Sequence, residues 1–500
     1  MTAGVREESR NGTASPALFE AGDPVAVLGL GRSGVAAARL ATALGARVYA
    51  SDASAGERQA GAAEALRAAG IDAELGRHDL GKILATRVVI VSPGIDPAAE
   101  VRQAVKEAGL PAVAEVELAF RHLRSRVIGI TGTNGKTTTT ALCGHLLQAG
   151  GVDAVTAGNI GRPLSEIALL ERQPGWAVVE LSSFQLADLA LFRPEIGVLL
   201  NLGPDHLDRY SNLDRYYADK KRLFANATPE SRWLLNADDA AVAELSRGVP
   251  GEHYFVSLEG PSLPGAFVDP SGEHLWLEIP GRRERWVRVD ELRLSGGHNV
   301  TNALLAGLAA ALAGCGGEAI AEGLRTFEGL PHRLRTVCER GGVLWVNDSK
   351  ATNISATSMA LRAFDRPVVL CLGGRHKGES YTTLEPALQG RARGVVAFGE
   401  AAPQIVRELA ESVPVLRVAS GMEGVVRTAA ELARRGDVVL FSPACSSYDM
   451  YPDYEARGRA FEEAAAAVGA GANGSAAAAI PGEGPRSAGA TEARGEEGGP

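Results

Sequence analysis

Short runs of apolar residues alternate with longer mixed segments along most of this chain. They form three series, at residues 24–29, 47–51 and 88–92, then 127–130, 177–181, 198–201 and 233–236, and last 344–347, 368–372, 394–398 and 438–442. Few of these runs alternate with polar residues, so each predicted strand should be buried on both faces. The pattern therefore predicts an α/β protein with three parallel, helix-covered sheets. Residues 252–292, rich in Pro, Gly and β-forming residues, predict a small antiparallel insertion.

Both ends of the chain lack this pattern. Residues 1–22 are polar, and residues 467–500 are mostly Ala, Gly, Ser, Pro and Glu. Segments of this kind cannot bury enough apolar surface to offset the entropy of ordering them. We expect disordered tails at 1–22 and 467–500.

Composition narrows the class of protein. The chain has 500 residues, a net charge of −9 and no Lys/Arg-rich block, which argues against a nucleic-acid partner. It has no apolar stretch of about 18 residues that could span a membrane, and its first residues lack a secretory signal. Its five cysteines are scattered, which fits a reducing cytoplasm. We expect a cytoplasmic monomer of about three domains.

The segment Thr131–Thr137 predicts a phosphate-binding loop. It follows an apolar strand and opens a predicted helix at residues 138–148. In such a loop, backbone N–H groups face the phosphates, Lys136 adds positive charge, and the Thr137 hydroxyl can reach Mg²⁺. Ile130 stands where the usual pattern has its first glycine, so this is a shortened variant.

A second glycine-rich turn, Gly29–Gly34, follows the first predicted strand, and Asp52 ends the next strand. Alone, this is a dinucleotide-binding fingerprint, which keeps an NAD(P)-dependent oxidoreductase open as an alternative. A mononucleotide diphosphate, or no ligand at all, would suit the turn equally well. The second phosphate-binding loop and the absence of a recognisable hydride-transfer constellation weigh against the oxidoreductase.

Several polar residues follow predicted strands of the second series. Glu180 is a natural Mg²⁺ ligand beside a phosphate-binding loop. His206, between Asp205 and Asp208, can bind metal or a substrate hydroxyl. Further along the chain stand Lys220 and Lys221 on an amphipathic stretch, and Asn299 and Asn302, which can cap a helix or contact an adenine edge.

These motifs, in this order, resemble those of the Mur ligase family of ATP-dependent amide-forming enzymes. The resemblance covers about residues 24–466 and rests on Ser92–Ile95, Gly158–Gly161, Glu180–Leu186, Asp205–Tyr210, Leu330–Arg333, Asn347–Asn353 and Ser442–Cys445. It implies a Rossmann-like N-terminal domain at 23–114 for a UDP-linked substrate, a P-loop ATPase-type central domain at 115–329, and a Rossmann-like C-terminal domain at 330–466 for an amino acid. Within the family, it points to the branch that adds D-glutamate to UDP-N-acetylmuramoyl-L-alanine through an acyl phosphate.

The resemblance also implies roles for individual residues. ATP would be bound by Gly132, Thr133, Asn134, Gly135, Lys136, Thr137, Thr138, Asn299, Asn302, Arg333 and Asp348. The UDP substrate would be bound by Arg32, Ser33, Asp52, Ser92, Asn159 and His206. The amino acid would be bound by Lys350, Thr352, Lys377, Ser447 and Tyr454, the last replacing the Phe of other members. Two Mg²⁺ ions would be held by Thr137, Glu180, His206 and a carbamylated Lys220, and the catalytic residues would be Lys136, His206 and Lys220.

Three alternatives remain at this point: a ligase of the same fold with another acceptor amino acid, the oxidoreductase, and a nucleotide-gated binding protein without chemistry. Because the phosphate, metal and amino-acid groups would come from two domains, the resemblance also predicts domain closure on ligand binding.

Overall fold

The computed structural model describes residues 17–206, 209–210, 212–294 and 296–468. Most of the two predicted tails, as well as Asp208, lies outside the described residues. Phe19 is buried against the core of the first domain, so the predicted tail at 1–22 is wrong over its last residues. Among the described residues, no helix has the length and apolar character needed to cross a membrane.

The first domain is a five-stranded parallel sheet of order β3-β2-β1-β4-β5. Its elements are β1 (Pro24–Leu28), α1 (Arg32–Ala43), β2 (Arg47–Asp52), α2 (Glu57–Ala68), β3 (Asp72–Leu75), α3 (Leu80–Leu84), β4 (Val88–Val91), α4 (Glu100–Glu107) and β5 (Ala112–Ala114). This is the doubly wound arrangement predicted, with β1 and β4 fully buried along their apolar runs. Helix α5 (Glu115–Arg121) then leads into the middle domain.

The middle domain is built on a nine-stranded sheet of order β14-β13-β12-β11-β10-β9-β6-β8-β7. Its strands are β6 (Arg126–Thr131), β7 (Ala154–Gly158), β8 (Trp176–Glu180), β9 (Ile196–Leu199), β10 (Arg232–Asn236), β11 (Glu252–Ser257), β12 (Gly265–Val268), β13 (His274–Ile279) and β14 (Arg282–Arg288). Its helices are α6 (Lys136–Ala149), α7 (Leu164–Ala168), α8 (Ser183–Ala187), α9 (Leu213–Lys221), α10 (Ala240–Leu245), α11 (Gly297–Leu312) and α12 (Gly317–Thr326), with 3-10 turns at Arg222–Phe224 and Val289–Glu291.

The predicted antiparallel insertion at 252–292 is only partly correct. Strands β12, β13 and β14 do pair antiparallel, but β11 pairs parallel with both β10 and β12. The segment therefore extends the main sheet and is not a separate layer. Leu275 and Leu277 of β13 are buried in the same apolar cluster as α11, which explains why the chain continues the sheet here.

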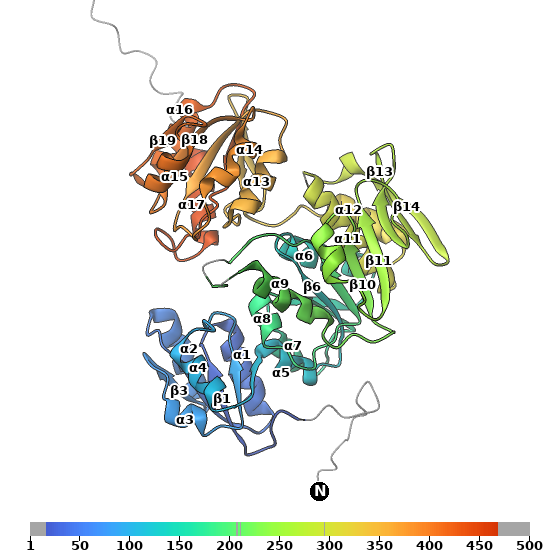
Figure 1. Cartoon of the computed structure of the whole chain (residues 1–500), viewed down its shortest axis with the longest axis vertical. Coiled ribbons are helices and arrows are strands. Elements are labelled where there is room, and N and C mark those ends of the chain that lie inside the picture. Colours follow the sequence, from blue (N-terminus) through green and yellow to red (C-terminus); the bar gives the residue numbers. More distant parts are fainter. Residues whose placement is uncertain (1–16, 207–208, 211, 295, 469–500) are drawn as a thin grey trace, which may run out of the picture.

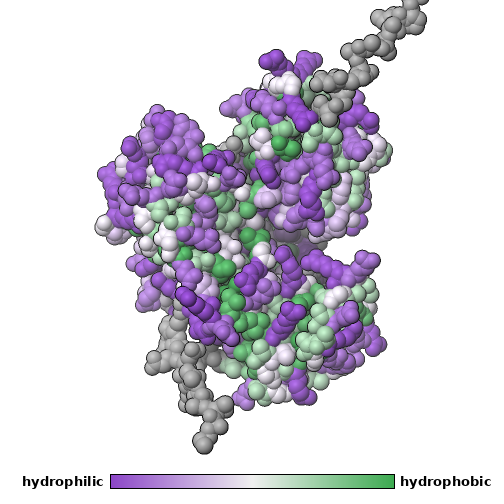
Figure 2. All heavy atoms as spheres, turned by 180° about the vertical axis from the view of Figure 1, so that it is seen from behind, coloured by the Kyte–Doolittle hydropathy of each residue, from purple (hydrophilic) through white to green (hydrophobic). Residues whose placement is uncertain are grey.

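The third domain has a six-stranded sheet of order β15-β16-β20-β17-β18-β19, parallel except for the β15–β16 pair. Its elements are β15 (Arg335–Arg340), β16 (Val343–Asn347), α13 (Ile354–Arg362), β17 (Val368–Gly373), a 3-10 turn (Tyr381–Leu384), α14 (Glu385–Leu388), β18 (Ala392–Phe398), α15 (Ala402–Leu409), β19 (Val415–Arg417), α16 (Gly421–Leu432), β20 (Val438–Phe441) and α17 (Tyr454–Ala467). Figure 1 shows this domain in orange and red beyond the middle domain, with the blue first domain on the middle domain's other side. From behind, polar residues cover most of the surface, and hydrophobic residues gather near the middle of the face (Figure 2).

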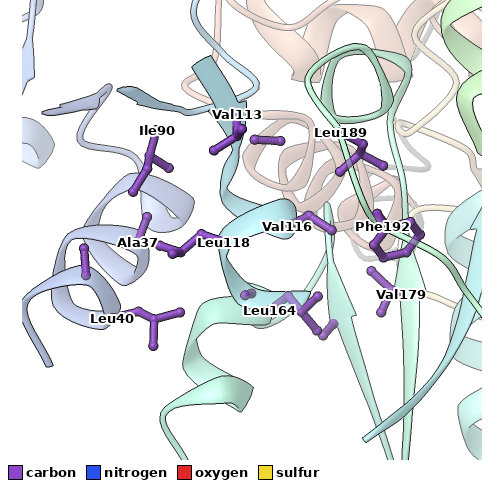
Figure 3. Close-up of a cluster of buried hydrophobic side chains, with 14 of the residues drawn as sticks. Ala37, Leu40, Ile90, Val113, Val116, Leu118, Leu164, Val179, Leu189 and Phe192 are labelled. Carbon is purple, nitrogen blue, oxygen red and sulfur yellow. The ribbon is translucent and has the colours of Figure 1, made fainter. Parts of the chain in front are cut away.

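The apolar cores do not correspond one to one with the three domains. One cluster runs from the first domain through α5 into one face of the middle sheet, and it includes Leu40, Val116 and Val179 (Figure 3). The other face of the middle sheet packs under α6, α11 and α12. The third domain has two clusters of its own, one on each face of its sheet. The first and middle domains thus share a core, whereas the third domain does not share one with them among the described residues.

Candidate active site

The predicted phosphate-binding loop lies between β6 and α6, at the carboxyl edge of the middle sheet. Gly135 adopts a left-handed conformation (φ 82°) and caps α6 without a side-chain hydrogen bond, which leaves the start of the helix open. A side chain there would collide with Asn302 Oδ1 and Leu200 Cδ2, at 2.4 and 2.9 Å from its Cβ. Lys136 folds back over the loop, and its Nζ donates to the carbonyl oxygens of Gly132 (3.0 Å) and Thr133 (2.7 Å).

Glu180 ends β8 directly beside this loop. Its Oε1 accepts a hydrogen bond from Asn159 Nδ2 at 2.9 Å. Its Oε2 is buried and has no hydrogen-bond partner among the described residues. A buried carboxylate oxygen without a partner is costly, and a hard cation such as Mg²⁺ is the kind of partner it accepts. The site therefore fits a metal next to the phosphate-binding loop.

Asp205 and His206 follow β9 in a strained turn, in which His206 has a left-handed backbone (φ 56°). Asp205 Oδ1 accepts from the His206 backbone N–H at 2.9 Å, and the imidazole lies 3.7 Å from Asp205 Oδ2. Burial opposes ionisation of Asp205, but nearby positive charge, chiefly from His206 and Lys377, outweighs it and lowers the pKa of the carboxyl. No group of three or more His, Cys, Asp or Glu side chains with metal-binding geometry occurs in the described part of the chain.

Lys220 is buried on the inner face of α9, whereas Lys221 is exposed. Its Nζ donates to Gly132 O at 2.7 Å and lies over the Tyr216 ring. Burial and then the charge of Lys136 hold the pKa of Lys220 well below its ordinary value. A lysine that readily loses its proton is the form that can react with CO₂, so Lys220 meets the chemical requirement for carbamylation.

Helix α11 brings Asn299 and Asn302 to the same cavity. Asn302 accepts from Thr139 Oγ1 at 3.2 Å and donates to Asn299 Oδ1 at 3.1 Å. The helix is capped by the backbone of Gly296, so neither asparagine serves as its N-cap. The two amides instead tie α11 to the helix that follows the phosphate-binding loop.

The third domain closes this cavity with Arg333, Asp348, Lys350 and Thr352. Asp348 accepts from Ser442 Oγ (2.8 Å) and from the Leu334 backbone N–H (3.2 Å), but burial still raises its pKa to about 7. Lys350 lies 3.7 Å over the Tyr454 ring, and burial, followed by the charge of Arg333, lowers its pKa to about 8.

Lys377 lies beside the cavity, and neither Lys377 nor Ser447 is among its lining residues. Lys377 Nζ donates to Thr352 Oγ1 at 3.4 Å, and Ser447 is buried at the end of the turn that follows β20. The contact with Thr352 puts Lys377 on the side of the cavity that the third domain provides.

Four of the predicted residues lie apart from the cavity, in the first domain. Asp52 accepts from the backbone N–H groups of Leu30 (2.7 Å) and Ser54 (2.8 Å), so its carboxylate organises the turn after β1. Ser92 donates to Gly29 O at 3.1 Å. Ser33 lies in the first turn of α1, and the exposed Arg32 donates to Gly161 O of the middle domain at 3.1 Å.

Family profiles match all three domains of this chain. A Mur ligase MurD-like N-terminal domain matches residues 23–114, a Mur ligase middle domain matches 130–310, and a Mur ligase glutamate ligase domain matches 332–445. A UDP-N-acetylmuramoylalanine–D-glutamate ligase of Anaeromyxobacter dehalogenans is 43% identical over 454 residues, covering 89% of this chain and 97% of the relative. The enzyme of the same name from Acidobacterium capsulatum is 40% identical, covering 88% and 96%.

This chain belongs to the Mur ligase family.

A solved structure supports the fold. The UDP-N-acetylmuramate-alanine ligase MurC of Thermotoga maritima has a TM-score of 0.56 with 20% sequence identity, and the match covers 89% of this chain and all of that one. At this identity the likeness concerns the fold alone.

Within this Mur ligase, the cavity also contains residues to which the sequence analysis gave no role. Ser182, Tyr216 and His298 line it, and Asn201 holds the phosphate-binding loop from behind. The only feature of the sequence that could have indicated a role for His298 is its position next to the predicted Asn299. Asn201 and Tyr216 contact a loop that lies 67 and 83 residues away, and no local pattern reveals such contacts.

Proposed function

We propose that this Mur ligase is an ATP-dependent acid–amino acid ligase that adds D-glutamate to UDP-N-acetylmuramoyl-L-alanine in peptidoglycan precursor synthesis. The observation that carries the proposal is a single cavity in which a phosphate-binding loop and an unpartnered buried carboxylate face Lys350 and Arg333 of the third domain. The names of the relatives support the choice of substrates.

In this proposal, ATP binds along the phosphate-binding loop from Gly132 to Thr138. Asn299, Asn302, Arg333 and Asp348 border the nucleotide end of the cavity. Lys136 would leave its loop carbonyl oxygens and turn its charge toward the terminal phosphates. Arg333 adds a second positive charge from the third domain. Both charges face the position where negative charge grows during phosphoryl transfer.

Thr137, Glu180, His206 and carbamylated Lys220 would hold two Mg²⁺ ions. Glu180 Oε2 supplies the observation in favour, since it is buried without a partner. When bound, Mg²⁺ supplies positive charge to the phosphate oxygens. The protein orients its own ligands: Asn159 holds one oxygen of Glu180, and Asp205 holds the turn that carries His206.

The UDP-linked substrate and the amino acid would be bound by the first and the third domain, respectively. Arg32, Ser33, Asp52 and Ser92 would bind the UDP end, with Asn159 and His206 at the muramoyl end. Lys350, Thr352, Lys377, Ser447 and Tyr454 would bind the amino acid, whose two carboxylates suit two lysines. The first domain's glycine turn would then hold a diphosphate, and the NAD(P)-dependent alternative has no further observation in its favour.

The chemistry follows from these positions. The substrate carboxylate attacks the terminal phosphorus of ATP, and ADP leaves, which gives an acyl phosphate. The neutral amine of D-glutamate then attacks the acyl carbon, and orthophosphate leaves as the amide forms. Lys136 stabilises the charge on the phosphoryl oxygens, and the closed third domain keeps water away from the acyl phosphate. We propose that the enzyme works as a monomer in the cytoplasm, where ATP is available.

A matrix of acceptors tests this function. The purified protein receives ATP, Mg²⁺ and UDP-N-acetylmuramoyl-L-alanine with D-Glu, L-Glu, D-Asp or L-Lys, and released orthophosphate is measured. We expect release that depends on D-Glu. Release that depends on another amino acid would establish the related ligase instead. No release with any acceptor, together with enhanced NAD(P)H fluorescence on binding, would favour the oxidoreductase.

A further inference from the structure

Asn201 follows β9 and contacts the phosphate-binding loop with both ends of its side chain. Its Oδ1 accepts from the Asn134 backbone N–H at 2.8 Å, and its Nδ2 donates to Asn134 O at 3.1 Å. Its own carbonyl oxygen accepts from the Thr133 backbone N–H at 2.9 Å. Three hydrogen bonds from one residue thus fix the backbone of two successive loop residues, Thr133 and Asn134.

These bonds divide the loop into two halves. The N–H groups of Thr133 and Asn134 are already used within the protein. The N–H groups of the next four residues, Gly135 to Thr138, have no acceptor among the described residues. They lie at the open start of α6, where the helix dipole also favours an anion.

The loop geometry explains why this division is stable. Gly132 and Gly135 take backbone conformations that other residues rarely adopt, at φ 155° and 82°. Such a loop has little intrinsic preference for one shape, because glycine allows many. The side-chain amide of Asn201 pairs with both the N–H donor and the carbonyl acceptor of Asn134, as the backbone of a neighbouring strand would in a sheet.

The same contact reaches the third domain. While Asn201 holds the backbone of Asn134, the Asn134 side chain donates to Ser355 Oγ of α13 at 3.2 Å. The fixed backbone of Asn134 therefore determines where the unbonded N–H groups of the loop begin. It also positions the Asn134 side chain for its contact with the third domain.

We propose that Asn201 is a positioning residue for nucleotide binding. It keeps the backbone N–H groups of Thr133 and Asn134 hydrogen-bonded within the protein, so that the phosphates are bound by the N–H groups of residues 135–138. This inference rests on the proposed ATP site and specifies which part of the loop contacts the phosphates.

The first test compares Asn201→Ala with Asn236→Ala. Asn236 ends the neighbouring strand β10, and its side chain accepts only from Asp238 N–H at 3.2 Å among the described residues, so it is a matched control. Calorimetry measures the Kd for ADP with Mg²⁺. We expect about tenfold weaker ADP binding in Asn201→Ala, since two hydrogen bonds to the loop are lost. UDP-substrate binding and the control variant should stay within about twofold of the wild type.

Turnover supplies a second readout. In Asn201→Ala the KM for ATP should rise by about tenfold, whereas kcat at saturating ATP should fall by less than about threefold. A general loss of structure would lower the melting temperature and all substrate affinities together. Asn201→Ser, which keeps an acceptor near Asn134, should recover part of the ADP affinity.

Hydrogen exchange of the wild-type protein tests the division of the loop without any mutation. We expect the Asn134 amide to be protected without nucleotide, and the amides of Gly135–Thr138 to become protected only when ADP and Mg²⁺ are added. Protection of the Asn134 amide that appears only with ADP would overturn the inference. ADP affinity in Asn201→Ala equal to that of the wild type would also overturn it, while leaving the proposed function intact. A wild-type protein that does not bind ADP would overturn both.

Discussion

The two junctions between the domains differ in polarity: the first is apolar and the second is polar. Between the first and middle domains, α5 lies inside one continuous apolar core, in which Val116 and Phe192 are buried (Figure 3). Between the middle and third domains lies the polar cavity, and the described contacts across it include the single hydrogen bond from Asn134 to Ser355.

The difference indicates which parts of the molecule can move. Apolar packing is lost when a junction opens, so the first and middle domains should stay together as one unit. Polar groups that face a cavity can exchange protein and water partners at low net cost, so the third domain can change position. The fixed junction would hold the UDP substrate against the phosphate-binding loop, and the other junction would admit and then enclose ATP and the amino acid.

Removing a charged side chain at the polar junction should affect catalysis more than any other change proposed below. Lys136→Ala removes a positive charge, and Glu180→Ala removes a carboxylate proposed to hold Mg²⁺. Either variant should lower kcat/KM by about a thousandfold, roughly 4 kcal/mol, because developing phosphoryl charge loses its compensation. UDP-substrate binding should stay within about twofold. The control is Lys221→Ala, which removes an exposed lysine. A comparable loss of UDP-substrate binding would show that the division of roles between the domains is wrong.

Removing an apolar side chain from the fixed junction should affect stability. Phe192 is buried, and its ring centroid lies 5.0 Å from that of Phe120. Phe192→Ala should reduce the free energy of unfolding by about 3 kcal/mol, because it leaves a cavity. Urea unfolding should show the first and middle domains melting together in both proteins. Leu416→Ala, at an exposed position of the third domain, should change stability by less than about 0.5 kcal/mol. Separate transitions for the first and middle domains would contradict a shared core.

A buried carboxyl at the same junction should make stability depend on pH. Burial raises the pKa of Glu115 from 4.5 to about 7, although Ser165 N–H donates to it at 2.6 Å. Between these two pH values the native protein keeps a proton that the unfolded chain has lost. The stabilising contribution is therefore complete below about pH 4.5 and decreases as the pH rises toward 7.

Glu115→Gln should remove this dependence. At pH 8 the variant should be more stable than the wild type by up to about 3 kcal/mol, and at pH 4.5 the two should agree. Denaturant titrations at both pH values give the comparison, with the exposed Glu64→Gln as control. If the wild type and Glu115→Gln were equally stable at pH 8, ionisation of the buried Glu115 would not destabilise the native protein.

The smallest effect concerns the bond that crosses the polar junction. Ser355→Ala removes the acceptor of Asn134 Nδ2 and should raise the KM for ATP by about two- to fivefold, roughly 1 kcal/mol, with no change in melting temperature. Ser358→Ala, on the same helix, is the control. An effect as large as that of Lys136→Ala would show that the third domain is fixed by this contact.

The sequence predicted the central strands well because their apolar runs are long and continuous, as in Val88–Val91. It did not reveal β3, β7 and β19, which are short strands at sheet edges and include exposed or half-buried residues. These strands form because a neighbouring strand offers hydrogen bonds, and that information is not local.

The same limit applies to the site. The phosphate-binding loop could be recognised because its glycines and Lys136 stand together in sequence. The choice of Lys220 over Lys221 came from resemblance and stays a prediction, to which the structure adds that Lys220 is buried on α9 whereas Lys221 is exposed. The Asn201 contact joins segments 67 residues apart, so only the folded chain shows it.

In the mechanism that we propose, the catalytic groups are divided between a fixed pair of domains and a third domain that closes on them. Double electron–electron resonance measures distances across both junctions between pairs of spin labels at the exposed positions Arg58, Glu244 and Arg427. The partly exposed Cys338 is replaced by Ser. On adding a non-hydrolysable ATP analogue, Mg²⁺ and both substrates, the 244–427 distance should shorten while the 58–244 distance stays the same. An unchanged 244–427 distance, or an equal change in both distances, would show that the third domain does not close on a fixed pair.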